Sequence, residues 1–329
     1  MGYSIYKIFT DLQHSESVNK NSFSALSLPF TQKHKIGISP EGYPMFFIEC
    51  DTNVHSLDIN LEFISVLFDR PCRLSENDIT QFEGVYTIIS LKTDNIDFQQ
   101  YFIEIVCIIL EQLSETPSHK QLKAEIQKLI ELFSRFSRPP RKTIQGLWAE
   151  IFIIEQAKDP EYLIQSWHAL PEDKFDFNDG QDKIEVKSTS QIRRVHNFSL
   201  EQLSPNHSSN LLIASVFTVQ TGRGKNIFDL KNSICQRVSN LQLQFRLNEI
   251  LSQTLGNDFD KVFDIYFDYQ QALDTLAFYD FRDIPTIQHD NIPHEIVNLR
   301  FDCDLSCVAT IRDKGFDTMR SMLFRSIQI

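Results

Sequence analysis

Three short segments of the sequence place an acidic residue two positions before a lysine. These triplets are Glu172-Asp-Lys174, Glu185-Val-Lys187 and Asp229-Leu-Lys231. A carboxylate and an ammonium group on one face of a protein suit phosphodiester hydrolysis, in which the acid helps to hold a divalent cation and the lysine orients or deprotonates the attacking water. The spacing alone is common, so we use the predicted secondary structure to decide which of the three triplets could be catalytic.

Only the triplet of Glu185 and Lys187 falls in a predicted β-strand. Side chains at positions i and i+2 of a strand point to the same face, whereas these positions diverge on a helix. The triplet that ends at Lys174 lies in a proline-led loop, and the one that ends at Lys231 lies in a predicted helix. We therefore select Glu185 and Lys187 as candidate catalytic residues.

A second acid, Asp176, is expected to face this pair. It lies between two phenylalanines, and the turn sequence Asn178-Asp-Gly180 predicts a hairpin that leads into the strand of Glu185. Two carboxylates that converge on one face favour a hard divalent cation such as Mg²⁺ or Mn²⁺. We predict Asp176 and Glu185 as the metal ligands, although a solvent-facing hairpin with surface ion pairs would give the same pattern.

A third acid, Glu150, lies on the apolar side of a helix predicted from about Thr143 to Ala157. Leu147 and Ile151 occupy the same stripe of this helix. An acid on a core-facing stripe costs free energy unless it is paired or bound to a metal. Glu150 is therefore a candidate catalytic acid, with an ion pair to a basic residue at the edge of the sheet as the alternative.

Polar residues near this centre are candidates for contacts with a nucleic acid. Arg194 and His196 share one face of the next predicted strand, and Gln202 follows in a predicted helical turn. We expect these three side chains to contact a DNA phosphate; a hydrogen-bonded histidine and a surface arginine are the alternative. Arg138 and Arg141 lie in a proline-containing segment, which indicates either a solvated linker or a contact with the phosphate backbone.

The elements that must position these residues form an α/β pattern between residues 139 and 255. The predicted order is a helix, three short strands, a short helix, a buried strand over Leu211–Val219 and one long amphipathic helix over Asn226–Leu251. Residues 1–138 are predicted to be a β-rich region that ends in helices, with a role in recognition or partner docking. Residues 256–329 are predicted to be an α+β extension.

The two flanking regions have periodicities of their own. Apolar residues alternate with polar ones over Leu57–Phe63, which predicts a half-buried strand. Helical spacing predicts helices over Phe98–Ser114 and Ser118–Phe136. In the C-terminal region, the alternation over Val297–Cys307 predicts a strand that buries its two cysteines as reduced thiols.

Composition excludes several classes of protein. The formal net charge of −12 argues against a surface covered by basic side chains. Residues 135–247 carry slightly more basic than acidic side chains, so the middle of the chain still suits a local contact with DNA.

No apolar segment is long enough to cross a bilayer, and the N-terminus lacks the features of a signal peptide, which predicts a cytoplasmic protein. The sequence contains no C-x-x-C, H-E-x-x-H or G-x-S-x-G motif.

Four segments together resemble the bacterial family known as PD-(D/E)XK motif proteins, within the restriction-endonuclease-like superfamily. They are Gly146-Leu-Trp-Ala-Glu150, Phe175-Asp-Phe177, Ile184-Glu-Val-Lys-Ser-Thr189 and Arg194-Val-His-Asn-Phe-Ser-Leu-Glu-Gln-Leu203. The resemblance implies that Asp176 and Glu185 bind the metal, that Lys187 is the catalytic lysine and that Glu150 is an auxiliary acid. The sequence departs from the superfamily pattern at Phe175, where a proline usually precedes the aspartate.

The resemblance also implies a fold and a function. The expected fold is α/β, with a restriction-endonuclease-like core at residues 139–255 in which helices flank a central mixed sheet. The expected function is that of a Mg²⁺-dependent DNA endonuclease in a restriction or phage-defence system, with helicase, ATPase or methyltransferase subunits as candidate partners and a homodimer as a route to cutting both strands. The alternatives are a catalytically silent nuclease-fold subunit that binds DNA or proteins, and a structural protein with surface ion pairs on its hairpin.

Overall fold

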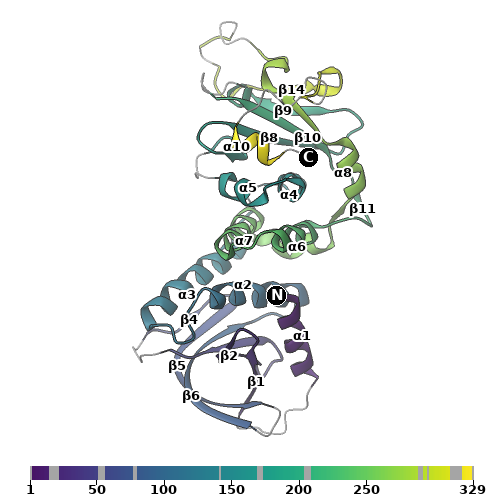
Figure 1. Ribbon diagram of the computed structural model, residues 1–329. Helices are drawn as coiled ribbons and strands as arrows, with labels where there is room; N and C mark the ends of the chain where they lie inside the picture. Colours follow the sequence, from purple (N-terminus) through teal and green to yellow (C-terminus); the bar gives the residue numbers. More distant parts are fainter. Residues whose placement is uncertain are drawn as a thin grey trace. The chain divides into compact units, whose positions relative to one another are not determined.

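The protein forms two compact units, coloured along the chain in Figure 1. The first contains Met1–Pro139 and Gly256–Asp260, and the second contains Pro140–Leu255 and Lys261–Ile329. The residues after 260, expected as an extension of the core, thus belong to the same unit as residues 140–255. The computed structural model describes residues 2–14, 22–50, 56–76, 80–140, 142–168, 173–203, 209–287, 292–294, 296–311 and 321–327.

The first unit is built on a six-stranded sheet in the order β1-β2-β3-β6-β5-β4. Its strands are β1 (Phe23–Leu28), β2 (Thr31–Ile38), β3 (Pro44–Ile48), β4 (Ile59–Asn60), β5 (Ile64–Glu76) and β6 (Thr80–Leu91). An additional parallel pairing of β1 with β5 closes five of these strands into a ring. The helices of the unit are α1 (Gly2–Gln13), α2 (Ile96–Glu111) and α3 (His119–Ser134). Helix α1 packs against α2 and β2.

Aromatic side chains hold the helices of the first unit together. The ring of Phe98 on α2 lies 5.8 Å from that of Phe133 on α3 and 5.1 Å from that of Phe136, which follows α3. The ring of Phe259 lies 5.3 Å from Phe98 and 4.3 Å from Phe136. These contacts explain why Gly256–Asp260 belong to the first unit although the neighbouring residues on both sides belong to the second.

The sequence predicts the helices of this unit better than its strands. The two predicted helices are confirmed as α2 and α3. The strand predicted over Leu57–Phe63 is wrong, because only Ile59–Asn60 is a strand there and Leu57 is 91% exposed. The sequence also missed α1, a short helix that buries Ile5 and Phe9 on one face.

The second unit contains a four-stranded mixed sheet in the order β13-β10-β8-β7. Its strands are β7 (Phe177–Asn178), β8 (Lys183–Thr189), β10 (Leu211–Phe217) and β13 (Ala277–Asp280). Strands β8 and β10 run parallel, whereas β7 and β13 are antiparallel to their neighbours. The connection between β8 and β10 contains β9 (Val195–Ser199), which pairs with β14 (Arg300–Asp304) in a separate two-stranded sheet. A third small sheet pairs β11 (Gln220–Thr221) with β12 (Tyr266–Phe267).

Helices cover one face of this sheet. The described helices of the unit are α4 (Ile144–Gln156), α5 (Pro160–Ser166), α6 (Ile227–Arg237), α7 (Leu241–Leu255), α8 (Tyr269–Thr275) and α10 (Met322–Ser326). Helix α4 packs against β8 and α8 against β10, whereas α6 packs on α4 and both α7 and α10 pack on α5. Figure 1 shows α4 and α5 beneath β8 and β10, with α6 and α7 as the next layer and β9 and β14 on the opposite side of the sheet. The predicted mixed α/β class is therefore confirmed. Among the described residues, no helix is both long and apolar enough to cross a bilayer.

Strand β14 is shorter than the strand predicted over Val297–Cys307. It ends at Asp304, whose carboxylate accepts a hydrogen bond of 2.9 Å from the backbone amide of Ser306 and thereby favours a 3₁₀ turn. Cys303 is buried within the strand, and this burial raises the pKa of its thiol. Cys307 is exposed because the chain has left the strand, so the prediction that it is buried is wrong.

The single long helix predicted over Asn226–Leu251 is also wrong, because the chain forms α6 and α7 with a break between them. Asn240 lies immediately before α7. Its side-chain oxygen accepts hydrogen bonds from the backbone amides of Gln242, at 2.9 Å, and Leu243, at 3.4 Å. An asparagine side chain that satisfies these amides favours a new helix start over continuation of the previous helix. Apolar periodicity alone does not reveal such a break.

We predict that Asn240→Ala destabilises the second unit by about 1 kcal/mol, because the first amides of α7 lose their acceptor. Asn240→Ser keeps an acceptor and is the control. Urea denaturation followed by circular dichroism measures the difference in free energy of unfolding. Equal unfolding midpoints for Asn240→Ala and the wild type would show that this cap is unimportant.

Candidate metal centre

The β7–β8 hairpin brings Asp176 and Glu185 to the same face of the sheet. The ladder pairs Phe177 with Ile184. The next position outward places Asp176 opposite Glu185, and opposite residues of an antiparallel pair share a face. One carboxylate oxygen of Asp176 accepts a hydrogen bond of 2.8 Å from the backbone amide of Val186, which fixes the acid against β8. Both carboxylates are buried, with 6% and 4% of the residues exposed.

Glu185 and Lys187 lie on one face of β8, as the period-2 spacing predicts. Their charged groups are 2.8 Å apart. Gln202, from the 3₁₀ turn Leu200–Leu203, donates to the Glu185 carboxylate at 2.5 Å and accepts from the Lys187 ammonium at 3.2 Å. The second carboxylate oxygen of Glu185, Oε2, is buried and has no hydrogen-bond partner among the described residues. Oε1 of this carboxylate is thus held by Gln202 and Lys187, whereas Oε2 is available to bind a ligand.

Glu150 lies on the face of α4 that is turned toward this sheet, and it is also buried. Its carboxylate accepts hydrogen bonds from the ammonium of Lys142, at 2.6 Å, and the indole of Trp167, at 2.8 Å. His168 Nε2 lies 3.0 Å from the same carboxylate. Lys142 also donates to Asp176, at 2.5 Å, and so links the acid on α4 to the acid on the hairpin.

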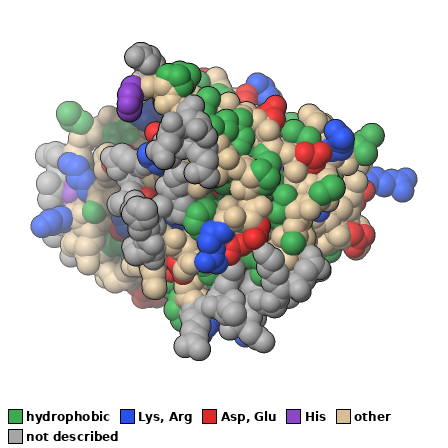
Figure 2. Space-filling model, turned by 90° about the horizontal axis from the view of Figure 1, so that it is seen from above, with side chains coloured by type: hydrophobic (Ala, Val, Ile, Leu, Met, Phe, Trp, Pro, Cys, Tyr) green, Lys and Arg blue, Asp and Glu red, His purple; other side chains and the backbone are tan. Residues whose placement is uncertain are grey.

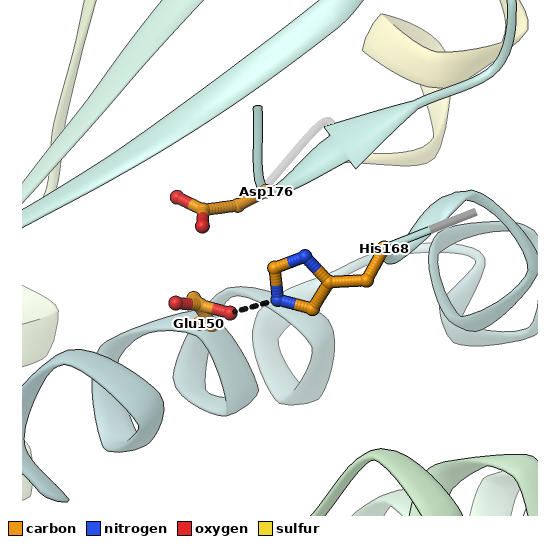
Figure 3. A group of neighbouring side chains, drawn as sticks. All are labelled: Glu150, His168 and Asp176. Carbon is orange, nitrogen blue, oxygen red and sulfur yellow. Dashed lines mark hydrogen bonds and ion pairs between the residues drawn. The ribbon is translucent and has the colours of Figure 1, made fainter. Parts of the chain in front are cut away.

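Glu150, His168 and Asp176 face one another from three different segments (Figure 3). Their potential ligand atoms all lie within 4.8 Å of one another. The sequence predicted the two acids but missed His168 and Lys142. The sequence around His168 has no clear periodicity, and Lys142 appears only as one of several basic residues next to the two prolines. The unusual feature that could have pointed to them is the acid on an apolar helix face, which requires a polar partner.

Burial raises the pKa of Glu185 to about 8, and the negative charge of Asp176 adds to this effect, while Lys187 opposes it. Burial also raises the pKa of Asp176, with the charge of Glu150 as the next cause. Both groups therefore bind protons more tightly than ordinary carboxylates, because burial disfavours their charged forms and the neighbouring acid of each adds to this effect.

At Glu150 and Lys142, nearby charges and hydrogen bonds outweigh the effect of burial on the pKa. Burial acts to raise the pKa of Glu150, but the hydrogen bond with His168 and the charge of Lys142 outweigh it and lower the pKa to about 2. Burial acts to lower the pKa of Lys142, but the carboxylates of Asp176 and Glu150 outweigh it and raise the pKa. Glu150 and Lys142 are thus an ion pair in which both groups keep their charge.

These residues fit a divalent cation. Glu185 Oε2 is a buried oxygen without a partner, and Asp176 supplies a second carboxylate on the same face. Carboxylate oxygens are the preferred protein ligands of Mg²⁺ and Mn²⁺, and a cation beside Glu185 would favour the charged form that burial and the charge of Asp176 disfavour. Asp176 and Glu185 would hold the ion, with Glu150 nearby.

Two of the predicted contacts with DNA lie inside the fold. The guanidinium of Arg194 donates to the backbone oxygen and hydroxyl of Ser215 on β10, at 3.1 and 2.8 Å, and to the backbone oxygen of Thr275. His196 is buried, and its Nε2 lies 2.7 Å from the Ser215 hydroxyl. These geometries favour the alternative of a hydrogen-bonded histidine for His196 and give Arg194 a role in joining β9 to β10.

The other predicted contacts lie elsewhere. Gln202 is half-buried, and its amide group contacts Glu185 and Lys187. Arg138 is exposed in the first unit, and Arg141 lies outside the described residues. On the face seen in Figure 2, the described Lys and Arg side chains are scattered among acidic and hydrophobic ones.

A mixed α/β unit in which acids and a lysine converge on one face of a hairpin is the arrangement expected of a PD-(D/E)XK-like protein. Residues 5–306 match the family described as "Putative PD-(D/E)XK family member, (DUF4420)". Because the match covers most of the 329 residues, the chain belongs to this family. The resemblance inferred from the sequence motifs is therefore confirmed. No curated protein and no solved structure matches the chain.

We predict that Glu185→Gln flattens the dependence of stability on pH in metal-free protein. The pKa of Glu185 is about 8 in the folded state, against about 4.3 for an unperturbed glutamate. Between these values the folded state binds the extra proton, so the wild-type protein loses stability as the pH rises from about 5 to 8. The glutamine variant lacks this proton and this loss.

Urea denaturation at several pH values in the presence of a chelator measures the effect. Glu201→Gln is the control, because Glu201 is an exposed acid paired with Lys174. Parallel pH profiles for the wild type and Glu185→Gln would contradict the prediction.

Proposed function

We propose that the protein is a DNA endonuclease that depends on Mg²⁺ or Mn²⁺ and hydrolyses phosphodiester bonds. The observation that carries this proposal is the convergence of Asp176 and Glu185 on one face, with a buried and unpartnered oxygen on Glu185. Lys187, on the same strand, pairs with the other oxygen of the Glu185 carboxylate, Oε1, at 2.8 Å. The family to which the chain belongs supports a nuclease-like fold.

The side chains of the centre divide the work of hydrolysis. Lys187 orients the attacking water and helps to remove its proton, and it is itself held by Gln202. The backbone amide of Val186 holds Asp176 in place, and Gln202 holds Glu185. When bound, a divalent ion supplies positive charge to the scissile phosphate and makes the water more acidic. Glu150 contributes negative charge from the helix side of the centre.

We also propose a setting for this activity. The resemblance of the motifs to a family associated with restriction and phage defence supports a role in such a system, in the cytoplasm. The first unit is then suited to recognition or to docking of a helicase, ATPase or methyltransferase partner, and Arg138 and Arg141 to contacts with the DNA backbone. Cleavage of both strands would be served by a homodimer, because each chain carries one centre.

The test is cleavage of plasmid DNA with Mg²⁺ or Mn²⁺ by the wild type and by Lys187→Ala. We expect the variant to lose at least about 100-fold in rate, the lower range for a positioned proton-transfer group. Lys174→Ala is the matched control. Lys174 belongs to a triplet of the same spacing, but it is exposed and pairs with Glu201 on the surface.

The outcomes separate the proposed enzyme from its main alternative. Cleavage that is lost in Lys187→Ala and kept in Lys174→Ala supports the endonuclease. DNA binding without cleavage by any of the three proteins would identify a catalytically silent nuclease-fold subunit. Equal cleavage by all three proteins would assign the activity to a contaminant or to another site.

A further inference from the structure

The group formed by Glu150, His168 and Asp176 already contains a cation of the protein's own. The ammonium nitrogen of Lys142 lies 2.6 Å from Glu150 Oε1 and 2.5 Å from Asp176 Oδ1. It lies 3.5 Å from His168 Nε2. The three distances place the nitrogen among the same three side chains whose ligand atoms lie within 4.8 Å of one another.

We propose that the ammonium group of Lys142 is a built-in cation that fills the Glu150–His168–Asp176 site and closes this site to a divalent ion. The inference rests on the proposed function, because it treats Asp176 and Glu185 as the place for the divalent ion. It goes beyond that function by assigning a second cation position and its occupant. The centre then takes up one divalent ion, and Lys142 takes the place of another.

Distances exclude simultaneous occupation. Mg²⁺ coordinates carboxylate oxygens at about 2.0–2.1 Å. The ammonium nitrogen is only 2.5–2.6 Å from both Glu150 Oε1 and Asp176 Oδ1, so it already occupies the position that an ion bridging these two oxygens would take. A divalent ion can enter this position only if the lysine side chain leaves it.

The local chain favours the observed position of Lys142. It immediately precedes Thr143, whose hydroxyl accepts a hydrogen bond of 3.1 Å from the backbone amide of Gly146 and caps α4. The cap fixes the backbone next to Lys142 at the start of the helix that carries Glu150. Because Glu150 and Asp176 are both nearly fully buried, loss of this ammonium would leave two acids close together with too little positive charge.

A second buried acid of α4, Glu155, pairs with the half-buried Lys225 and shows what distinguishes the site. Glu155 on α4 accepts hydrogen bonds from Lys225 at 3.2 Å, from Ser233 at 2.8 Å and from Tyr269 at 2.9 Å. Among the described residues, the groups around Glu155 include the hydroxyls of Ser233 and Tyr269. The groups around Lys142 instead include a second acid, Asp176, and the imidazole of His168. Lys225 is therefore a matched control for removal of an ammonium group from a buried acid of α4.

The experiment counts Mn²⁺ sites in the full chain by electron paramagnetic resonance and by calorimetric titration. We expect one site in the wild type and two in Lys142→Ala, because removal of the ammonium exposes two carboxylates and an imidazole, a ligand set that Mn²⁺ accepts. Lys142→Ala/His168→Ala is expected to return to one site or to bind the second ion at least tenfold more weakly. Lys225→Ala is expected to bind one ion.

A second measurement covers the case in which Lys142→Ala folds poorly. Mn²⁺ should then raise the melting temperature of Lys142→Ala by more than it raises that of the wild type, since the ion replaces the lost positive charge. An equal or smaller increase in Lys142→Ala overturns the inference. A wild-type protein that already binds two ions also overturns it.

The site counts separate the failure of this inference from the failure of the proposed function. One site in both the wild type and Lys142→Ala overturns the built-in cation and leaves the endonuclease standing. No site in the wild type and one in Lys142→Ala supports the built-in cation but contradicts a metal bound by Asp176 and Glu185. No site in either protein overturns both.

Discussion

Three buried carboxylates and two ammonium groups meet between α4 and the β7–β8 hairpin, and the second unit is arranged around the need to balance them. An ion that leaves water without compensation costs several kcal/mol even after the protein relaxes. Lys142 compensates Glu150 and one side of Asp176, and Lys187 compensates one side of Glu185. The compensation is incomplete at Glu185, where an oxygen has no partner among the described residues. A centre in which negative charges outnumber positive ones in this way is suited to bind an additional cation.

The surrounding elements hold these charges by ordinary structural means. A short hairpin sets Asp176 opposite Glu185, and the backbone of β8 binds the Asp176 side chain directly. The parallel partner strand β10 covers β8 along its whole length. Helix α4 adds Glu150 from the helix layer, because its residues Leu147–Glu155 are buried and the helix packs against β8 and α6. Each acid is therefore positioned by the backbone of the β7–β8 hairpin or of helix α4.

Short-range patterns made part of this centre predictable from the sequence. The period of a strand placed Glu185 and Lys187 together, the turn at Gly180 brought Asp176 to them, and an acid on an apolar helix stripe singled out Glu150. Lys142 and His168 could not be predicted in this way. Lys142 reaches Asp176 across 34 residues and His168 reaches Glu150 across 18, and no periodicity connects either pair.

The errors in the fold have similar causes. Apolar periodicity continues through Asn240, although the side chain of this residue starts a new helix. Alternation over Leu57–Phe63 has the period of a strand, but the buried strand of that region is β5. For Arg194 and His196, the prediction that they share a face agrees with their common contact to Ser215. The sequence did not indicate that this face would be covered by β10.

The pairing of β9 with β14 has a consequence for how the protein matures on the ribosome. Gln202, which contacts Glu185 and Lys187, lies in the 3₁₀ turn that follows β9. The backbone amide of Leu200 in this turn donates a hydrogen bond to the carbonyl of Leu299. The segment that holds Glu185 and Lys187 therefore depends on residues about one hundred positions later in the sequence. Nascent chains fold from the N-terminus as they emerge. The charged residues thus emerge first, and the strand that anchors their polar support is synthesised about one hundred residues later. The centre reaches its final arrangement only after β14 has also been synthesised.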